Sequence, residues 1–345
     1  SREVPGDDPP RAAVAVAARD EGPHIPALLS ALQAQDYPPG SLQVVLADDG
    51  STDRTRDLLT SPPPGPHEVT ALHLDLDPAG GSPKKRALAR AIASTGAPLL
   101  LLTDADTVPP PRWARIMAAA LDGGCPVVGG YSPGRPRKGI LGLVAGSWEL
   151  GTAALAGGFA GLGRPLHMSG RNWGFRRGLY EEAGGYAGLE DALSGDDTLL
   201  AQKMAARAPS TGWGFTLDPD LTVPTHPPEG WSHFLSQRRR HAATGKRFRP
   251  AQLLLAALSF LVFAFLWVGL ITFPWAPWGR GAVGAALFLK LGTDTAALTW
   301  SACRAGEGSL IPFFPLFSLL HLFFFPVIQA AGTLLPFRWK GRRGR

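Results

Sequence analysis

The stretch Leu42-Gln43-Val44-Val45-Leu46-Ala47-Asp48-Asp49-Gly50-Ser51-Thr52-Asp53 decides the fold of this 345-residue chain. It begins with an apolar run typical of a buried β-strand, and an acidic, turn-forming cluster follows at once. The same succession recurs where Pro98-Leu99-Leu100-Leu101-Leu102 precedes Thr103-Asp104-Ala105-Asp106. We therefore expect both clusters at the carboxyl ends of parallel strands, which is where open α/β sheets bind ligands.

Strand and helix signals alternate through the first part of the chain. Segment 25–35, for example, has apolar residues at helical spacing and ends in a turn-forming Pro-Pro-Gly. This alternation predicts an α/β fold with a doubly wound, mostly parallel sheet for residues 1 to about 130. The expected strands cover 12–18, 42–46, 69–74 and 98–102, and the expected helices cover 25–35, a segment from 53, and 83–94.

The chain is basic, with 34 lysines and arginines against 28 aspartates and glutamates. The positive charge concentrates at 237–249 and 338–345, on either side of long apolar runs. The positive-inside rule and anionic lipid explain this placement, and a DNA-binding signature is absent, so we expect no nucleic-acid partner. Cys125 and Cys303 are too few and too isolated for a disulfide framework or a zinc site, which fits a domain that faces a reducing cytoplasm.

Three long apolar segments follow residue 250. Segment 253–273 is apolar throughout and predicts a transmembrane helix. Segment 281–303 is a weaker candidate because Lys290 and Asp294 lie one helical turn apart, either as an intrahelical ion pair or as a contact for a lipid-linked substrate. Segment 310–337 is interrupted by prolines. Three complete spans would place the basic tail outside, against the positive-inside rule, so we expect one segment to be re-entrant or interfacial.

Segment 140–163 is long enough to cross a membrane, but it is rich in glycine and contains Glu149. We expect a buried or interfacial helix pair there in preference to a span. Such a pair would either line a cleft for the acceptor or serve packing alone, and the sequence does not separate these two alternatives.

Six short polar motifs punctuate the chain: Arg19-Asp20-Glu21, Asp48-Asp49-Gly50-Ser51-Thr52-Asp53, Lys84-Lys85-x-Ala87-Leu88, Asp104-Ala105-Asp106, Gly195-Asp196-Asp197 and Gln237-Arg238-Arg239-Arg240-His241. Their order and spacing resemble the family 2 inverting glycosyltransferases with the GT-A fold, and most of all the membrane-anchored bacterial branch related to cellulose and hyaluronan synthases. The resemblance covers residues 11 to 250. It implies a catalytic domain over 1–250 with a donor half to about 130 and an acceptor half over 131–250, a membrane domain of two to three hydrophobic segments over 251–337, and a basic tail at 338–345.

The resemblance also implies roles on the donor side. Arg19 and Glu21 follow the first strand and would contact the nucleoside, while Asp49 would accept a hydrogen bond from the imide of a uracil ring. Lys85, together with Lys84, would approach the sugar or the phosphates as a point charge. The alternatives are a structural turn and helix cap for the cluster around Asp49, and a solvated basic helix start for the two lysines.

Asp104 and Asp106 match the metal motif of the family. By this resemblance Asp106 would be the more direct ligand and Asp104 would lie nearer the ribose or the metal; Mg²⁺ or Mn²⁺ suits such oxygen ligands together with phosphates. Asp197 matches the general base that removes the proton of the acceptor hydroxyl, and Asp196 would position the acceptor or tune its neighbour. A plain helix N-terminus with two acidic residues is the alternative for this pair.

Gln237 and Arg240 match a Gln-x-x-Arg-Trp motif in which the arginine meets the diphosphate and the tryptophan floors the acceptor channel. Here His241 replaces the tryptophan, which favours transfer of a single sugar over processive polymerisation. For Arg238 and Arg239 we expect an additional basic face at a membrane entry.

Together these expectations describe a membrane-bound, metal-dependent inverting glycosyltransferase. Its donor would be a nucleotide-diphosphate sugar, in particular a UDP-sugar, and its acceptor a lipid, a lipid-linked molecule or a glycan. We expect a multi-pass protein of the cytoplasmic membrane with its catalytic domain facing the cytoplasm. The alternatives are a processive polysaccharide synthase, a scaffold that binds nucleotide sugar without turnover, and a metal-dependent nucleotidyltransferase, whose usual Gly-rich Arg-Lys phosphate loop is absent after the first strand.

Overall fold

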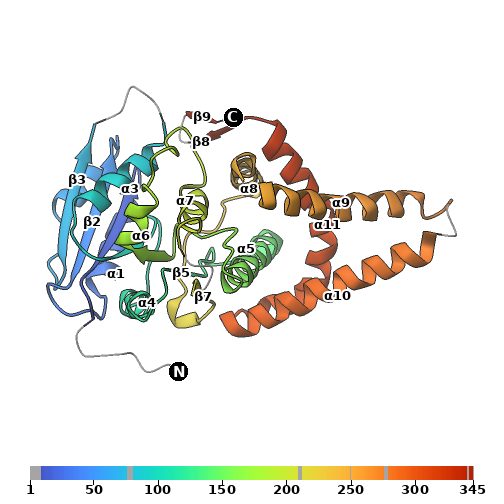
Figure 1. The fold of residues 1–345 in the computed structure, drawn as a ribbon, viewed down its shortest axis with the longest axis horizontal. Helices are drawn as coiled ribbons and strands as arrows, with labels where there is room; N and C mark the ends of the chain where they lie inside the picture. Colours follow the sequence, from blue (N-terminus) through green and yellow to red (C-terminus); the bar gives the residue numbers. More distant parts are fainter. Residues whose placement is uncertain are drawn as a thin grey trace. The chain divides into compact units, whose positions relative to one another are not determined.

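A computed structural model describes residues 9–75, 81–208, 212–248, 250–275, 279–339 and 342–344. The chain forms two compact units (Figure 1). The first unit comprises residues 1–136 and 155–227, and the second comprises residues 137–154 and 228–345. The second unit therefore takes in part of an earlier helix together with residues 228–345.

The first unit is built on a seven-stranded sheet with the order β3-β2-β1-β4-β6-β5-β7. All neighbouring strands are parallel except β6, which runs antiparallel to β4 and β5. The predicted α/β architecture with a mostly parallel sheet is thus confirmed. The strands are β1 (Ala12–Ala18), β2 (Leu42–Asp49), β3 (Glu68–Leu74), β4 (Leu99–Leu102), β5 (Val127–Gly130), β6 (Trp173–Arg176) and β7 (Gly214–Thr216).

The apolar strands are buried because helices cover both faces of the sheet. Side chains at alternate positions of β1 point to opposite faces, so Val14 belongs to one core cluster and Ala13 to the other. Packed against the first face are α1 (Ile25–Gln33), α2 (Thr55–Thr60) and α4 (Trp113–Asp122). Packed against the second are α3 (Pro83–Ala93), α6 (Arg177–Glu182) and α7 (Asp196–Met204).

This topology brings the polar motifs to one edge of the sheet. Strands β2, β1 and β4 are parallel neighbours, so the loops that follow them meet at their carboxyl ends. Strand β6 runs the other way, and its first residue, Trp173, pairs with the last residue of β4, Leu102. The segment that leads into β6 therefore lies at the same edge, where Thr103 Oγ1 donates a 2.8 Å hydrogen bond to the carbonyl oxygen of Arg171.

The second unit is helical. Its helices are part of α5 (Gly139–Gly161), then α8 (Trp231–Ala243), α9 (Pro250–Thr272), α10 (Arg280–Ala305) and α11 (Phe314–Leu334). A short hairpin of β8 (Phe337–Trp339) and β9 (Arg342–Gly344) follows, and the rest of the expected basic tail lies outside the described residues. The helix pair expected at 140–163 is wrong, because α5 is one continuous helix despite its glycines.

Three helices of the described chain are long and apolar enough to cross a membrane: Gly139–Gly161, Gln252–Thr272 and Gly308–Leu334, the last including the 3-10 turn before α11. Helix α10 is not among them. It contains the Lys290–Asp294 pair, which the structure shows as an intrahelical ion pair with Lys290 Nζ 5.2 Å from the centre of the Phe263 ring on α9. Of the two alternatives that the sequence left open, an ion pair or a contact for a lipid-linked substrate, the structure shows the ion pair.

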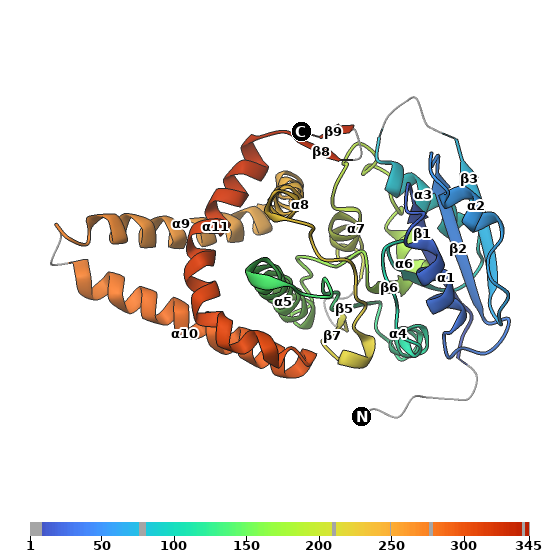
Figure 2. The ribbon, with the colours of Figure 1, turned by 180° about the vertical axis from the view of Figure 1, so that it is seen from behind.

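Helix α11 runs across α9 and α10 rather than alongside them (Figures 1 and 2). Its contact with α9 is limited to about one turn of each helix. Trp267 Nε1 donates a 2.9 Å hydrogen bond to the carbonyl oxygen of Leu322, and the rings of Phe263 and Phe325 stack with centroids 5.0 Å apart. Two helices that lay side by side would share contacts over several turns, so these contacts agree with a crossing.

Candidate active site

Lys84 pairs with aspartates of two other polar motifs of the first unit. Its Nζ lies 2.7 Å from Asp104 Oδ1 in the loop after β4 and 3.0 Å from Asp196 Oδ2 at the start of α7. Pro83 starts α3 with a suitable backbone angle, and this places Lys84 in the first turn of the helix at the sheet edge. Three of the motifs predicted from the sequence therefore meet at one ammonium group.

The charges of this cluster shift one another's protonation. Burial lowers the pKa of Lys84, but Asp104 and Asp196 outweigh it and hold that pKa well above its usual value. Burial, with repulsion from Asp106 and Asp196, raises the pKa of Asp104 although Lys84 opposes this. For Asp196 burial acts in the same direction, yet the Lys84 ammonium dominates and the pKa is lowered. The ammonium thus stabilises the carboxylate of Asp196 in its ionised form.

Asp197 has different surroundings from Asp196. Its Oδ2 accepts a 2.7 Å hydrogen bond from the backbone N–H of Gly170, and its Oδ1 accepts one of 2.5 Å from the N–H of Thr198. Within the described part of the chain it forms no ion pair. Gly195 has a φ of +74°, a conformation that glycine adopts without strain, and this turn starts α7 so that both aspartates lie in its first turn. Asp197 is consequently oriented by backbone donors and has no cation bound to it.

Asp106 is held by Thr225, which lies far away in the sequence. The hydroxyl of Thr225 donates a 2.8 Å hydrogen bond to Asp106 Oδ2. The same threonine forms isolated β-bridges with Thr107 and Gly134, so its backbone position is fixed from both sides. The carboxylate of Asp106 is therefore oriented before any ligand binds.

Asp104 and Asp106 are the residues that could hold a divalent cation. No group of three or more His, Cys, Asp or Glu side chains suitable for a metal occurs among the described residues. Each of the two aspartates, however, has one carboxylate oxygen with a protein partner and a second oxygen with none given by the structure. Two carboxylates of this kind suit a hard cation that completes its shell with phosphate oxygens and water. The residues fit a cation that is shared with a diphosphate.

The expected nucleoside contact, Asp49, is enclosed by two arginines. Arg19 Nη1 donates to Asp49 Oδ2 at 3.2 Å, and Arg86 Nη2 donates to Oδ1 at 2.5 Å. The Asp49 side chain is only 2% exposed. The structure thus pairs Asp49 with Arg19 and adds Arg86, which the sequence analysis missed although it directly follows the two lysines.

Hydrogen bonds tie the loop after β1 to the loop after β2. The backbone N–H of Glu21 donates to Thr55 Oγ1 at 2.8 Å, and the N–H of Gly22 donates to Asp53 Oδ2 at 2.9 Å. Burial raises the pKa of Asp53, but hydrogen bonds from the hydroxyl and the backbone N–H of Thr55, together with the one from Gly22, outweigh it and lower that pKa. Asp53 therefore has the structural role of a turn and helix-start residue, and the arrangement fixes the backbone of Arg19 and Glu21.

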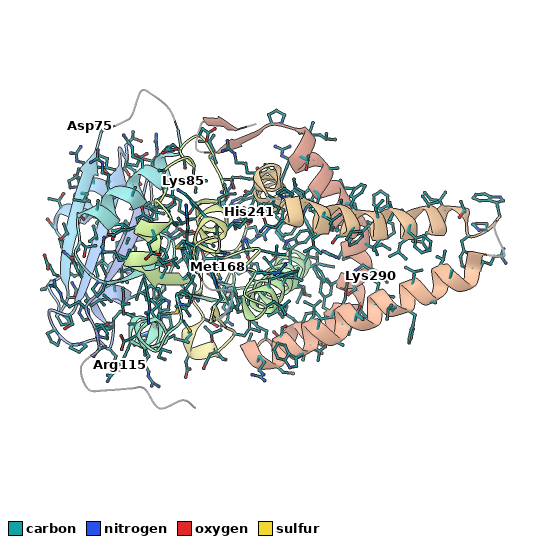
Figure 3. The ribbon with its side chains drawn as sticks, viewed as in Figure 1. Asp75, Lys85, Arg115, Met168, His241 and Lys290 are labelled. Atoms are coloured by element: carbon teal, nitrogen blue, oxygen red, sulfur yellow. The ribbon has the colours of Figure 1, made fainter. Side chains whose placement is uncertain are left out.

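Lys85, which is labelled in Figure 3, lies in the first turn of α3. Its side chain is buried, with 1% of its surface exposed. Its ammonium donates hydrogen bonds to the carbonyl oxygens of Ala192 and Ser194 in the loop before α7. This geometry gives no support to the expected donor contact of Lys85, since the side chain supports the loop that carries Asp196. The neighbouring Lys84 occupies the acidic site instead, because successive residues of a helix point in directions about 100° apart.

Gln237 and Arg240 lie on α8 in the second unit. Between them, Arg238 corrects an expectation: it is not on a basic surface but is buried over the Phe234 ring, with its Nη2 3.8 Å from Glu149 Oε1 on α5. Its Nη2 also donates to Gln237 Oε1 at 2.8 Å. Arg238 therefore orients Gln237 and connects α8 to α5.

Comparisons with known proteins agree with this geometry. The family model described as glycosyl transferase family 2 matches residues 13–184, and the model described as glycosyl transferase family group 2 matches residues 99–330. The chain belongs to glycosyltransferase family 2. No curated protein matches this glycosyltransferase.

Solved structures show the same fold as this family 2 glycosyltransferase. The mannosyltransferase PcManGT from Pyrobaculum calidifontis, in complex with GDP-Man and Mn²⁺, is 23% identical with a TM-score of 0.52, over 92% of this chain and 88% of that one. S. aureus TarS 1-349 in complex with UDP-GlcNAc is 16% identical with a TM-score of 0.50, over 96% of this chain and 95% of that one. Both likenesses support the GT-A fold.

Two further residues of the glycosyltransferase site escaped the sequence analysis. Thr225 and Gly170 carry no motif of their own and reach Asp106 and Asp197 only through the fold. The place of Gly170 in the site depends on the antiparallel direction of β6, for which the sequence carries no signal. For Thr225 the sequence offered no signal either.

Proposed function

We propose that this glycosyltransferase moves a sugar, with inversion, from a nucleotide-diphosphate sugar to a hydroxyl group of a lipid or lipid-linked acceptor. The observation that carries the proposal is the contrast between Asp196 and Asp197. The first aspartate is neutralised by Lys84 and linked through it to Asp104. The second is oriented by backbone N–H groups and has no ion pair among the described residues. The carboxylate of Asp196 thus helps to hold the motifs together, while the carboxylate of Asp197 is available to accept a proton.

In the proposed reaction, Asp197 takes the proton of the acceptor hydroxyl as the oxygen attacks the anomeric carbon. The new bond forms between that carbon and the acceptor oxygen, and the bond from the carbon to the diphosphate oxygen breaks. The nucleoside diphosphate leaves with the bonding electron pair. Because attack and departure occur on opposite faces of the sugar, one carboxylate suffices and no covalent intermediate is required.

Asp104 and Asp106 would hold the divalent cation, Mg²⁺ or Mn²⁺, with Asp106 oriented by Thr225. Such a cation neutralises the negative charge that develops on a departing diphosphate. The Mn²⁺ named in the PcManGT complex supports this part of the proposal. Chelation by EDTA should abolish turnover, and an unchanged rate would contradict metal dependence.

For the donor we propose a uridine nucleotide. The Asp49 carboxylate, which Arg19 and Arg86 hold in this structure, would accept a hydrogen bond from an N–H of the base once the nucleotide displaces one of these contacts, and Glu21 lies on the same loop as Arg19. The nucleotide sugars named in the related structures, GDP-Man and UDP-GlcNAc, support a nucleotide-sugar donor but differ in the base. Turnover measured with a panel of nucleotide sugars would decide between a uridine and a guanosine donor.

We further propose that the second unit anchors the enzyme in the cytoplasmic membrane with α9 and α10 as a hairpin and α11 in the membrane plane. Helix α10 falls short of the three candidate spans in apolar character, but its internal charges Lys290 and Asp294 are paired with each other. Large apolar residues are exposed along α9, among them Leu254, Leu261 and Ile271, and lipid is the natural partner of such a surface. Because α11 crosses the hairpin, it would lie parallel to the surface if the hairpin spans. The basic segments before α9 and after α11 then lie on one side, as the positive-inside rule requires.

This topology predicts which positions a membrane-impermeant thiol reagent reaches. In a variant without its native cysteines, Trp275→Cys at the hairpin tip and Gly344→Cys in the tail should react from opposite sides of sealed inverted vesicles. Reaction of both from the same side would contradict the two-span hairpin with an in-plane α11.

The activity itself is tested with the full chain in lipid nanodiscs. We would measure the release of nucleoside diphosphate from a panel of UDP-, GDP- and other nucleotide sugars in the presence of extracted membrane lipids. Release from a UDP-sugar that depends on lipid supports the proposal. Release of pyrophosphate from a nucleoside triphosphate would instead indicate a nucleotidyltransferase.

A further inference from the structure

The acidic site of the first unit contains a cation of its own. The ammonium of Lys84 bridges Asp104 and Asp196 at 2.7 and 3.0 Å. A Cβ atom on Gly170 would lie 3.3 Å from Oδ2 of both Asp196 and Asp197 and 3.5 Å from Lys84 Nζ, so these groups converge on one glycine. The ammonium is therefore the positive centre around which the carboxylates of two separate motifs are arranged.

This ion pair is within reach of solutes. The side chains of Lys84 and Asp104 are 22% and 26% exposed. The backbone of Lys84 is fixed in the first turn of α3, but its ammonium is a point charge on a flexible four-carbon stem. The ammonium can thus leave Asp104 for another anion without any movement of the helix.

We propose that Lys84 is the built-in counter-cation of this site and competes with the divalent cation for Asp104. The inference rests on the metal site of the proposed function. Asp104 is both the partner of the lysine and one of the two candidate metal ligands, so an ammonium and a divalent cation repel each other there. In the absence of nucleotide, Lys84 keeps the affinity of the site for metal low. A diphosphate offers the ammonium new oxygen partners, so that donor and metal bind together.

A purely structural ion pair predicts something different. If Lys84 only fastened α3 to α7, its removal would free the two segments, and the affinity for metal would stay the same or fall. Competition predicts a rise, because a positive charge disappears beside an unchanged pair of ligands. The direction of the change therefore separates the two roles.

The experiment is a titration of the full chain in lipid nanodiscs with Mn²⁺, followed by electron paramagnetic resonance, without any nucleotide. Loss of the like charge in Lys84→Met should raise the affinity for Mn²⁺ about tenfold or more. Lys84→Arg keeps the charge and should stay at or below the wild-type affinity. Lys203→Met is the matched control, since Lys203 Nζ donates to the backbone carbonyls of Gly184, Gly185 and Ala187 and not to carboxylates.

Lys84→Gln is the second variant should Lys84→Met fail to fold, because glutamine keeps a hydrogen-bond donor for Asp104 without the charge. It too should gain affinity for Mn²⁺. An unchanged or weaker affinity in folded Lys84→Gln or Lys84→Met overturns the proposal. Since no nucleotide is present, this outcome is independent of the donor. A protein that shows the gain in affinity but binds no nucleoside diphosphate would contradict the proposed function and leave the inference standing.

The complementary measurement is the binding of UDP by calorimetry in EDTA. The wild-type protein and Lys84→Arg should retain measurable binding, because the side chain supplies positive charge to the diphosphate. Lys84→Gln should lose at least about tenfold in affinity, since charge-assisted contacts are the strong ones. Equal affinity of UDP for wild-type and Lys84→Gln would contradict the role of Lys84 as a counter-cation for the donor.

Discussion

The backbone N–H of Gly170 donates a 2.7 Å hydrogen bond to Oδ2 of Asp197, and the α-carbon of that glycine faces the carboxylates. The contact exists because β6 runs antiparallel to β4, which brings the segment before β6 to the ligand-binding edge of the sheet. Its φ angle does not require a glycine, but the space is tight, since a Cβ there would lie 3.3 Å from Oδ2 of Asp196 and of Asp197 and these side chains would have to shift.

Gly170→Ala should therefore lower turnover and leave donor binding intact. The added methyl group pushes the carboxylate of Asp197 by a few tenths of an ångström, and small misplacements of a reacting group cost about tenfold or more in rate. Steady-state kinetics and calorimetric binding of UDP check the two halves of this prediction. Gly178→Ala is the control, because a Cβ there meets no atom within 4 Å. Normal turnover in Gly170→Ala would show that the position of Asp197 is uncritical.

Asp197→Asn should abolish turnover while the affinity for the nucleotide stays nearly unchanged. The asparagine keeps the size of the side chain but cannot accept the proton of the acceptor, and the loss of a general base typically costs about 100- to 10,000-fold in rate. Asp191→Asn in the preceding loop, whose side chain is exposed, is the matched control. A variant with near wild-type turnover would remove Asp197 from the catalytic step.

Thr225→Val should weaken the binding of the divalent cation without changing the fold. Valine has the shape of threonine but cannot donate the 2.8 Å hydrogen bond to Asp106 Oδ2. Loss of such a supporting contact typically costs about 10- to 100-fold in metal affinity. Titration with Mn²⁺ in the presence of UDP measures the effect, with Thr222→Val as the control threonine in the same segment. Equal Mn²⁺ affinity in the two variants would contradict an orienting role for Thr225.

The fold was largely predictable because local sequence decides it. The apolar runs of β1, β2 and β4 and the helical spacing of α1 predict alternating strands and helices. Parallel pairing of these strands then brings the loops that follow them to one edge of the sheet. The antiparallel strand β6 was not predictable, because its four residues carry no signal of direction. For the same reason the contact of Thr225 with Asp106 escaped: the two residues are 119 positions apart, and only the tertiary fold joins them.

The candidate site also shows that a sequence motif does not tell which of two adjacent, identical residues reaches the site. Lys84 and Lys85 are chemically equal in sequence, and only the rotation of α3 sends the first to the acidic site and the second into the core. Arg238, in contrast, carried a readable signal. It lies four residues after Phe234 and four before Ala242, and all three are buried on one face of α8. Helical periodicity would have placed it inside, whereas its charge suggested the surface.

Arg238→Met should destabilise the second unit. The substitution removes the guanidinium that lies 3.8 Å from the buried carboxylate of Glu149, and breaking a buried pair in this way typically costs about 3–5 kcal/mol. Thermal denaturation in nanodiscs, followed by tryptophan fluorescence, measures the loss. The double variant Arg238→Met with Glu149→Gln removes both charges and should recover most of the stability. If the single and double variants melt alike, the pair is not what connects α8 to α5.

Arg240→Ala and His241→Ala should differ sharply, although the residues are neighbours on α8 with Arg240 Nη2 3.4 Å from His241 Nε2. A guanidinium that binds the diphosphate gains strength as the leaving group gains charge, so its loss should lower turnover about 100- to 1,000-fold. Arg239→Ala on the same helix controls for the loss of a positive charge. His241 stands where the Gln-x-x-Arg-Trp motif has the tryptophan expected to floor a channel for a growing glycan, and its side chain is exposed.

An enzyme that adds one sugar to each acceptor has no use for such a floor, so His241→Ala should retain most of the activity. Chromatography of the lipid extract should then show a single added sugar for both the wild-type protein and His241→Ala. His241→Trp restores the indole and provides the reciprocal test. A polymerase needs a channel for the glycan as well as an aromatic floor, so this variant should still add a single sugar. Recovery of a long polymer from the wild-type protein would overturn single-sugar transfer and assign the chain to the processive synthases.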